Sequence, residues 1–127
     1  MAKWVHSNVL DDGLNYIKTN ASKMVLLKAY SAGDNYATVS GNIIATVNMV
    51  SGDYTLSSSG SNRVLTTAAG KSDTADLNSG AAPDLHIGFT NGTDTVIWVT
   101  DETSDQVITA GNIVNFPQIT YTSNQPT

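Results

Sequence analysis

The chain contains no cysteine and only one arginine, Arg63. Without cysteine it forms no disulfide, no thiolate metal site and no cysteine nucleophile, and its redox compartment stays undecided. Its 6 Lys and Arg face 11 Asp and Glu, which gives a net charge of −5. Because nucleic-acid binding depends on clustered Lys and Arg, this balance argues against direct contact with nucleic acid.

Long apolar runs are also missing, so we expect neither a signal peptide nor a membrane span, and we expect synthesis in the cytoplasm. Charged residues make up 13% of the chain, about half the usual share, and Ser, Thr and Asn take their place. A chain of 127 residues with 40% hydrophobic residues is long enough for one domain with its own core. The surface is therefore nearly neutral and rich in hydroxyl groups.

Residues 7–18 have the pattern of a short amphipathic helix. Ser7 or Asn8 is the expected N-cap, Asp11 and Asp12 are expected in the first turn, and Lys18 in the last turn, where each charge suits the helix dipole. The apolar positions that recur at helical spacing are Val9, Leu10, Leu14 and Ile17.

From residue 23 onward the chain changes to short β-rich runs that alternate with clusters of Gly, Ser, Asn and Asp. Such clusters at intervals of roughly 8 to 12 residues are typical of an all-β sandwich or barrel. We therefore predict an N-terminal arm and helix over 1–22, a β domain over 23–122 and a C-terminal tail over 123–127. Eight or nine strands are expected among these runs: 23–30, 43–50, 53–58, 63–68, 74–77, 85–90, 95–100, 106–108, 113–116 and 119–122.

Two positions constrain how these strands connect. The dipeptide Asn91-Gly92 favours a tight hairpin turn, so residues 85–89 should pair antiparallel with residues 96–99. Pro117 has no N–H to donate within a strand ladder, so an edge, a bulge or a bend is expected near it.

No arrangement of residues predicts catalysis, a metal site or a cofactor, and we expect a protein that is not an enzyme. The two histidines, His6 and His86, lie in no known catalytic or zinc motif, and His86 alternates with apolar neighbours as an exposed or hydrogen-bonded strand residue does. Nearly all acids are Asp, the usual turn acid. The densest acidic loop holds Asp101, Glu102 and Asp105, but it lacks the regular ligand spacing of a calcium loop.

The two tryptophans have different surroundings. Trp98 belongs to the run 96–99, which is apolar on both faces and is expected in the core or at a subunit contact. Trp4 lies in a segment too short to bury it, and is better explained as an anchor in a partner or under the helix.

Over nearly its whole length the chain resembles the small decoration or cement proteins on the capsids of tailed bacteriophages. The pieces that carry the resemblance follow in order: Trp4-Val5-His6, Val9-Leu10-Asp11, then Leu14, Ile17, Asn20 and Met24, residues 52–56, residues 63–66, and residues 108–117. The resemblance implies a β-sandwich or jelly roll of about eight strands with one short N-terminal helix. It also implies binding to the outer surface of the phage head, where such a protein stabilises contacts between major capsid protein subunits.

On this resemblance the partners are the major capsid protein and further copies of the chain, as a dimer or trimer, and the location is the outer capsid surface of the virion. The N-terminal segment 1–17 and the C-terminal tail are the expected arms, since neither forms a core of its own. The residues expected to contact the capsid or another subunit are Trp4, Val5, His6, Val9, Leu10, Leu14, Ile17, Trp98 and Phe116.

Three other functions fit the same residues. A carbohydrate-binding or receptor-binding β-sandwich module would place Tyr and Trp with Asp and Asn on one exposed face. A small hydrolase would depend on a residue such as His86 or Asp101. Another phage tail or neck structural protein would share the architecture and differ in its location.

Overall fold

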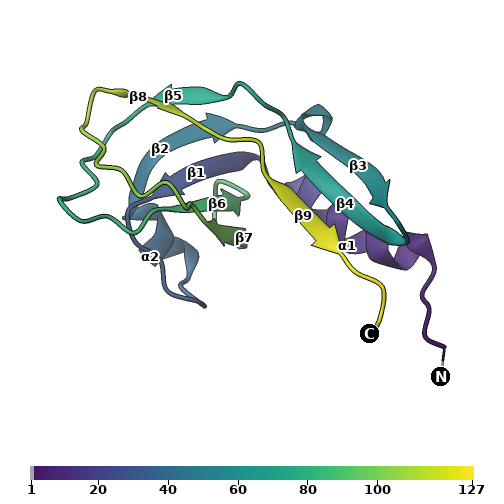
Figure 1. Ribbon diagram of the computed structural model, residues 1–127. Helices are drawn as coiled ribbons and strands as arrows, with labels where there is room; N and C mark the ends of the chain where they lie inside the picture. The colour runs from purple at the N-terminus through teal and green to yellow at the C-terminus, as the bar shows by residue number, and fades with distance from the viewer. Residues whose placement is uncertain (1) are drawn as a thin grey trace.

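The computed structural model describes residues 2–127 and confirms a mostly β fold with one main helix, consistent with a small β-sandwich (Figure 1). Its strands form three antiparallel sheets, in the orders β2-β1-β6-β7, β3-β4-β9 and β5-β8. Among residues 2–127 no helix is both long and apolar enough to span a membrane. The elements are α1 (Ser7–Asn20), β1 (Lys23–Leu27), α2 (Tyr36–Ser40), β2 (Ile43–Asn48), η1 (Ser51–Asp53), β3 (Tyr54–Ser59), β4 (Asn62–Thr67), β5 (Ser72–Thr74), β6 (His86–Thr90), β7 (Val96–Asp101), β8 (Ile113–Asn115) and β9 (Thr120–Ser123).

The predicted N-terminal helix is present as α1, and Leu10, Leu14 and Ile17 form its buried face. The prediction of its cap was wrong: the N-cap is His6, whose Nδ1 accepts a hydrogen bond from the Asn8 N–H at 3.1 Å. Since the helix begins at Ser7, its first turn contains no acidic residue, whereas Lys18 does lie in the last turn. The helix therefore depends on packing more than on complementary charge at its start.

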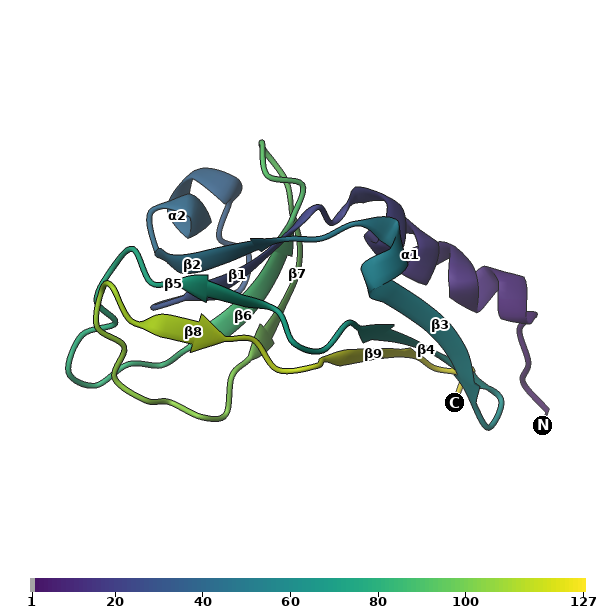
Figure 2. The same cartoon turned by 90° about the horizontal axis from the view of Figure 1, so that it is seen from above.

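The four-stranded sheet is covered on both faces, which explains why β1 is buried from Met24 to Leu27. One face carries Met24, Leu26 and Phe89 into the main core. The other face carries Val25 and Leu27, against which Val39 of the short helix α2 packs. Figure 2 shows the resulting layers, with α2 on one side of the sheet and β5 and β8 on the other.

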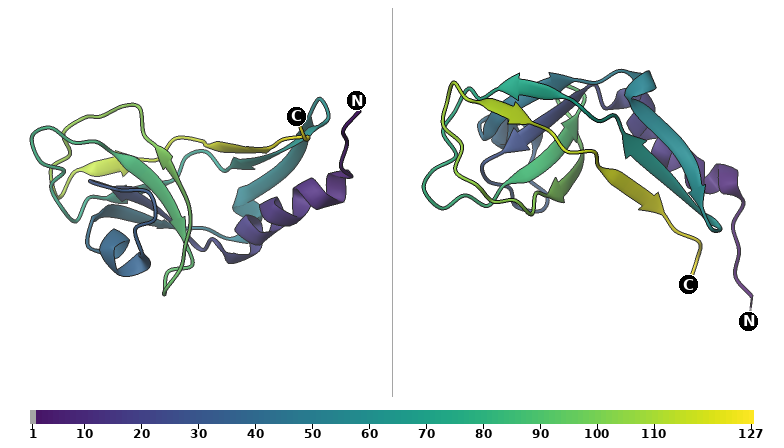
Figure 3. Two further views of the ribbon diagram at one scale, coloured as in Figure 1. Left: turned by 90° about the horizontal axis from the view of Figure 1, so that it is seen from below. Right: turned by 45° about the horizontal axis from the view of Figure 1, so that its top comes forward.

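A long bent ribbon forms the second layer. The chain runs from β4 into β5 and returns from β8 into β9, so one antiparallel ribbon is divided between two sheets (Figure 3, right). Pro117 lies at the break, as its missing N–H predicts. Across the break the Phe116 N–H donates to the Lys71 carbonyl and the Thr67 N–H to the Ile119 carbonyl, both at 2.9 Å. The ribbon thus bends without losing its connection.

Beyond this bend the β3-β4-β9 sheet is covered by α1 (Figure 3, left). Tyr54 and Leu65 are fully buried there and join the main core. At the surface Arg63 Nε donates to Asp11 Oδ1 at 2.7 Å, which links β4 to the helix. The helix is therefore part of the folded domain, although the sequence grouped it with the N-terminal arm.

Two local predictions need correction, and one element was not predicted. The run 106–108 forms no strand, because Ser79 binds its backbone: the Ile108 N–H donates to Ser79 Oγ at 2.8 Å. The helix α2 was not expected from its sequence. β6 and β7 pair antiparallel as predicted, but five residues connect them, and the Asn91 Oδ1 accepts hydrogen bonds from the N–H groups of Thr93, Asp94 and Thr95.

Candidate functional site

An exposed apolar surface lies on the N-terminal segment and the outer side of α1. We call it the terminal surface; it consists of Trp4, His6, Val9 and Tyr16. Trp4 is 71% exposed, Val9 63% and Tyr16 54%. Val9 and Tyr16 lie seven residues apart on α1 and therefore share one helix face. The rings of Trp4 and His6 meet edge to face at 5.8 Å, so the surface carries a small aromatic group at its start.

The residues that the sequence proposed as contacts divide into three groups. Leu10, Leu14, Ile17 and Phe116 are buried, and the core already occupies their side chains. Val5 and Trp98 are half-buried. Trp4, His6 and Val9 are exposed. Periodicity placed Val9 on one apolar face with Leu10, Leu14 and Ile17, but Val9 is exposed. It did not single out Tyr16, although the spacing of Tyr16 from Val9 was a usable signal.

The two chain ends lie at the same end of the molecule as the start of α1 (Figure 1). Gln125 of the C-terminal tail holds the N-terminal segment: its Oε1 accepts from the Val5 N–H at 3.0 Å, and its Nε2 donates to the Val5 carbonyl at 2.9 Å. The tail is itself held by Asn62, whose Oδ1 accepts from the Gln125 N–H at 2.8 Å. The segment before α1 is therefore positioned by the folded domain.

Trp98 lies on the edge strand β7 and stacks on Phe89, with ring centroids 4.5 Å apart. Tyr121 meets Trp98 edge to face at 5.1 Å. The side chain is half-buried, although its strand is apolar on both faces, a pattern that predicted a place in the core or at a subunit contact. An edge position explains this difference, since a strand with a neighbour on one side only stays open on the other.

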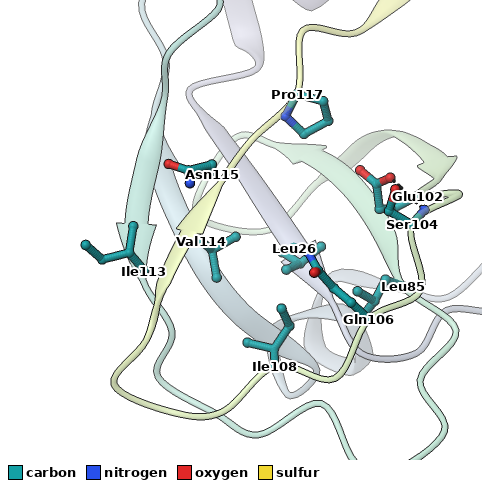
Figure 4. Close-up of a pocket in the computed structure, with 10 residues that line it drawn as sticks. All are labelled: Leu26, Leu85, Glu102, Ser104, Gln106, Ile108, Ile113, Val114, Asn115 and Pro117. Atoms are coloured by element: carbon teal, nitrogen blue, oxygen red, sulfur yellow. Dashed lines mark hydrogen bonds between the residues drawn. The ribbon is translucent and has the colours of Figure 1, made fainter.

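A cavity of about 390 Å³ lies beside β8 (Figure 4). In Figure 4, Glu102 and Ser104 lie on one side of it and Ile113 on the other, with Leu26 between them. The buried Leu85 also lines it. Glu102 is the only titratable residue in its lining, and its Oε1 accepts from the Ser104 N–H at 3.0 Å. Glycoside hydrolysis usually needs two opposed carboxyl groups, so this lining offers no acid–base pair.

The acidic loop that the sequence singled out does not converge on one point. The Asp105 Oδ1 accepts from the Leu85 N–H at 2.8 Å, and Glu102 binds within its own loop. Asp101 instead faces His86, with 3.8 Å between its Oδ1 and His86 Nε2. Within residues 2–127 one group of acidic and histidine side chains comes close enough to share an ion: Asp84, His86 and Asp101. This group was not predicted from the sequence, although the spacing Asp84-Leu85-His86 places its first two members on one side of an extended chain.

The carboxyl and phenol groups with a shifted pKa do not line the cavity beside β8. Hydrogen bonds from the Val50 N–H and from Lys71 lower the pKa of Asp53. Burial raises the pKa of Tyr54, and the nearby Asp53 charge adds to the effect. Hydrogen bonds from Asn91 and Thr95 lower the pKa of Asp94. Each shift follows from local structure and identifies no catalytic group.

Comparison of the chain with protein-family models, curated proteins and solved structures gives no match.

Proposed function

We propose that this protein is a structural virion protein that decorates the phage head. It binds the outer surface of the capsid and stabilises contacts between major capsid protein subunits, without catalysis. The resemblance of its sequence to decoration and cement proteins supports this, and so does its near-neutral, hydroxyl-rich composition. The observation that carries the proposal is the terminal surface, where a tryptophan and two further apolar side chains are exposed on the N-terminal segment and on α1.

The proposed contact is concentrated on Trp4. Tryptophan is among the residues most often found at the energetic centre of protein interfaces. Burying a side chain such as Val9 fully contributes roughly 1.5 to 3 kcal/mol, and the larger ring of Trp4 adds more apolar area. Gln125 positions the segment before it binds, which lowers the entropy lost on binding. Because the protein binds only the assembled shell, every bound copy stabilises that shell by mass action.

The test measures decoration of expanded phage heads that lack this protein. Trp98→Phe leaves Trp4 as the only tryptophan, so its fluorescence reports on its surroundings. We expect the Trp4 emission to shift to shorter wavelength as heads are added, and the protein to sediment with them. Trp4→Ala and Val9→Ala together should abolish co-sedimentation. Val107→Ala and Ile113→Ala, which remove similarly exposed apolar side chains outside the terminal surface, are the matched controls and should bind normally.

Electron microscopy of decorated heads then gives the location. Regular density on the head surface, lost with the Trp4 and Val9 variant, supports the proposal. Density at the tail or neck instead of the head would show that the protein is a tail or neck structural protein and would overturn the proposal. Full occupancy by the Trp4 and Val9 variant would show that the terminal surface is not the contact. Binding of the isolated protein to glycans, with none to heads, would favour a carbohydrate-binding or receptor-binding module.

A further inference from the structure

Three side chains around the open end of the β6–β7 hairpin face one another. His86 and Asp101 are directly opposed residues of β6 and β7, which places their side chains on the same face of the sheet. Asp84 lies two residues before His86. One ligand atom from each of Asp84, His86 and Asp101 lies within 4.8 Å of the other two. This group lies apart from the terminal surface.

The hydrogen bonding of His86 determines which ring nitrogen is free. Its Nδ1 lies 3.1 Å from the Asp84 carbonyl oxygen, an acceptor, so Nδ1 carries the proton that it donates there. In the neutral ring Nε2 then holds a lone pair, and it faces the Asp101 carboxylate oxygen at 3.8 Å. This separation is too long for a hydrogen bond. Two acceptors facing each other across such a gap are suited to a shared cation.

We propose that Asp84, His86 and Asp101 bind one divalent transition-metal ion of the Zn²⁺ class. Two ligands of a tetrahedral zinc ion, each about 2.1 Å from the metal, lie about 3.4 Å apart. His86 and Asp101 therefore need to approach by a few tenths of an ångström, and Asp84, whose ligand atom lies within 4.8 Å of the other two, by up to about 1.4 Å. A histidine that ligates a metal through Nε2 usually donates its other N–H to a carbonyl or carboxylate, as His86 does to Asp84. Imidazole nitrogen favours zinc, copper or nickel over calcium or magnesium, which prefer oxygen ligands.

The backbone that carries these ligands is fixed before any ion binds. Leu85, between the first two ligands, is buried, and its N–H donates to Asp105 Oδ1 at 2.8 Å. Its carbonyl accepts from the Glu102 N–H at 2.9 Å, which links the residue before His86 to the residue after Asp101. Asp105 and Glu102 therefore act as positioning residues in this proposal. Asp101 and Asp84 are exposed, so their side chains can turn toward the ion.

The surroundings leave room for further ligands. A shallow cavity of about 300 Å³ opens beside His86 and Asp101, with Tyr30 and Val99 in its lining. Tyr30 meets the His86 ring edge to face, with centroids 5.8 Å apart, and so limits rotation of the ring. Three protein ligands leave a fourth tetrahedral position, which water or a side chain of a second protein can fill.

The experiment is a calorimetric titration of untagged, chelator-treated protein with zinc chloride. We expect one ion per chain. His86→Asn and Asp101→Asn should each weaken the affinity roughly tenfold or more, and Asp84→Asn should weaken it as well. The matched controls are His6→Asn, which changes the only other histidine to a good N-cap residue, and Asp12→Asn, which removes an exposed carboxylate on α1. Both controls should bind zinc as the unmodified chain does.

A second measurement uses the unmodified protein and so does not depend on the folding of any variant. Zinc should shift the Nε2 resonance of His86 in nitrogen NMR spectra and leave the His6 resonances in place. Cobalt in place of zinc should give the intense visible absorption of a tetrahedral site. No binding at millimolar zinc, or binding lost in His6→Asn and kept in His86→Asn, would overturn the assignment. Head binding is measured separately, so either proposal can fail alone.

Discussion

Gln125 and Val5, 120 positions apart in sequence, are joined by two hydrogen bonds in opposite directions. The Val5 N–H donates to the side-chain oxygen of Gln125, and the side-chain amide of Gln125 donates to the Val5 carbonyl. The Gln125 side chain thus pairs with both the N–H and the carbonyl of Val5, as a neighbouring strand would do. This arrangement makes the position of Trp4, one residue earlier, depend on the last residues of the chain.

The first prediction concerns this link. Gln125→Ala should lower the free energy of unfolding by only about 1 kcal/mol, because a typical hydrogen bond contributes about 0.5 to 1.5 kcal/mol and chain ends fray. The larger effect is local: the Val5 amide should exchange with solvent much faster, as hydrogen exchange followed by NMR can measure. Gln125→Glu keeps the acceptor for the Val5 N–H and loses the donor to the Val5 carbonyl. In this variant the Val5 amide should therefore exchange faster than in the unmodified chain and more slowly than in Gln125→Ala. An unchanged Val5 exchange rate in Gln125→Ala would contradict the proposed link.

The second prediction concerns acid stability. The Asp53 Oδ2 accepts from the Val50 N–H and from Lys71 Nζ, both at 2.9 Å, and these bonds hold the pKa of Asp53 below its ordinary value of 3.8. A carboxyl group whose pKa is lowered by folding stabilises the fold above its unfolded pKa. That contribution is lost as the pH falls through the lower, folded pKa.

Denaturation measured from pH 5 downward tests this. Asp53→Asn should be less stable than the unmodified chain at pH 5, and the difference should shrink as the pH falls below about 3.8. Lys71→Met removes the ion pair but keeps the bond from Val50, the larger cause of the shift, so it should retain part of the pH dependence. Equal pH dependence in all three proteins would refute this role for Asp53.

The third prediction concerns the alkaline side. Tyr54 is 1% exposed, and its hydroxyl donates to the Ala21 carbonyl at 2.7 Å, which ties β3 to the end of α1. Burial raises its pKa above the ordinary value of 10, so the folded state keeps the phenol proton longer than the unfolded chain does. Stability should therefore be complete below about pH 10 and fall as the pH rises beyond it.

Tyr54→Phe separates the contribution of the hydrogen bond to Ala21 from the contribution of the phenol proton to the pH dependence. It leaves a buried carbonyl without this donor, so near neutral pH it should cost about 1 to 3 kcal/mol of unfolding free energy. Its stability should then vary less with pH above 10 than that of the unmodified chain. Chemical denaturation at pH 8 and pH 11 measures both effects. A steeper alkaline loss in Tyr54→Phe would be inconsistent with this account.

Much of the fold follows from local pattern. Helical spacing placed Leu10, Leu14 and Ile17 on one buried face of α1. Most of the β-rich runs matched strands, because the turn residues between them are strong signals, but 106–108 forms no strand and 74–77 shares only Thr74 with β5. The missing N–H of Pro117 predicted the break in the ribbon. These features depend on residues close together in sequence, which is why the sequence alone indicates them.

Other features depend on distant partners. The run 106–108 has a strand-like composition, but Ser79, about 29 residues earlier, binds its backbone and keeps it in a loop. The grouping of Asp84 with His86 and Asp101 requires the register of the β6–β7 hairpin. The Asn91-Gly92 signal predicted that hairpin but gave a shorter loop, because it did not include the bonds that Asn91 makes across five residues. The pairing was therefore predictable, and the side-chain constellation was only partly so.

The last prediction uses two glycines with opposite surroundings. Gly88 lies in β6 beneath Val25 and Leu27, and a Cβ at this position would approach Val25 Cγ2 to 3.2 Å and Leu27 Cδ1 to 3.4 Å. Both neighbours are buried and cannot withdraw freely. Gly13 lies within α1, and a Cβ there would meet nothing within 4 Å. The same added methyl group should therefore have opposite effects at the two positions.

Gly88→Ala should destabilise the protein by about 1 to 3 kcal/mol, the usual cost of forcing an extra carbon into a packed core. Gly13→Ala should stabilise it by about 0.5 to 1 kcal/mol, since alanine restricts the unfolded chain and favours the helix. Urea denaturation of the two variants and the unmodified protein measures both changes. Because the sites lie in different elements, the double variant should show roughly the sum of the two effects. A neutral or stabilising Gly88→Ala would mean that the sheet face carrying Val25 and Leu27 is packed more loosely than its contacts indicate.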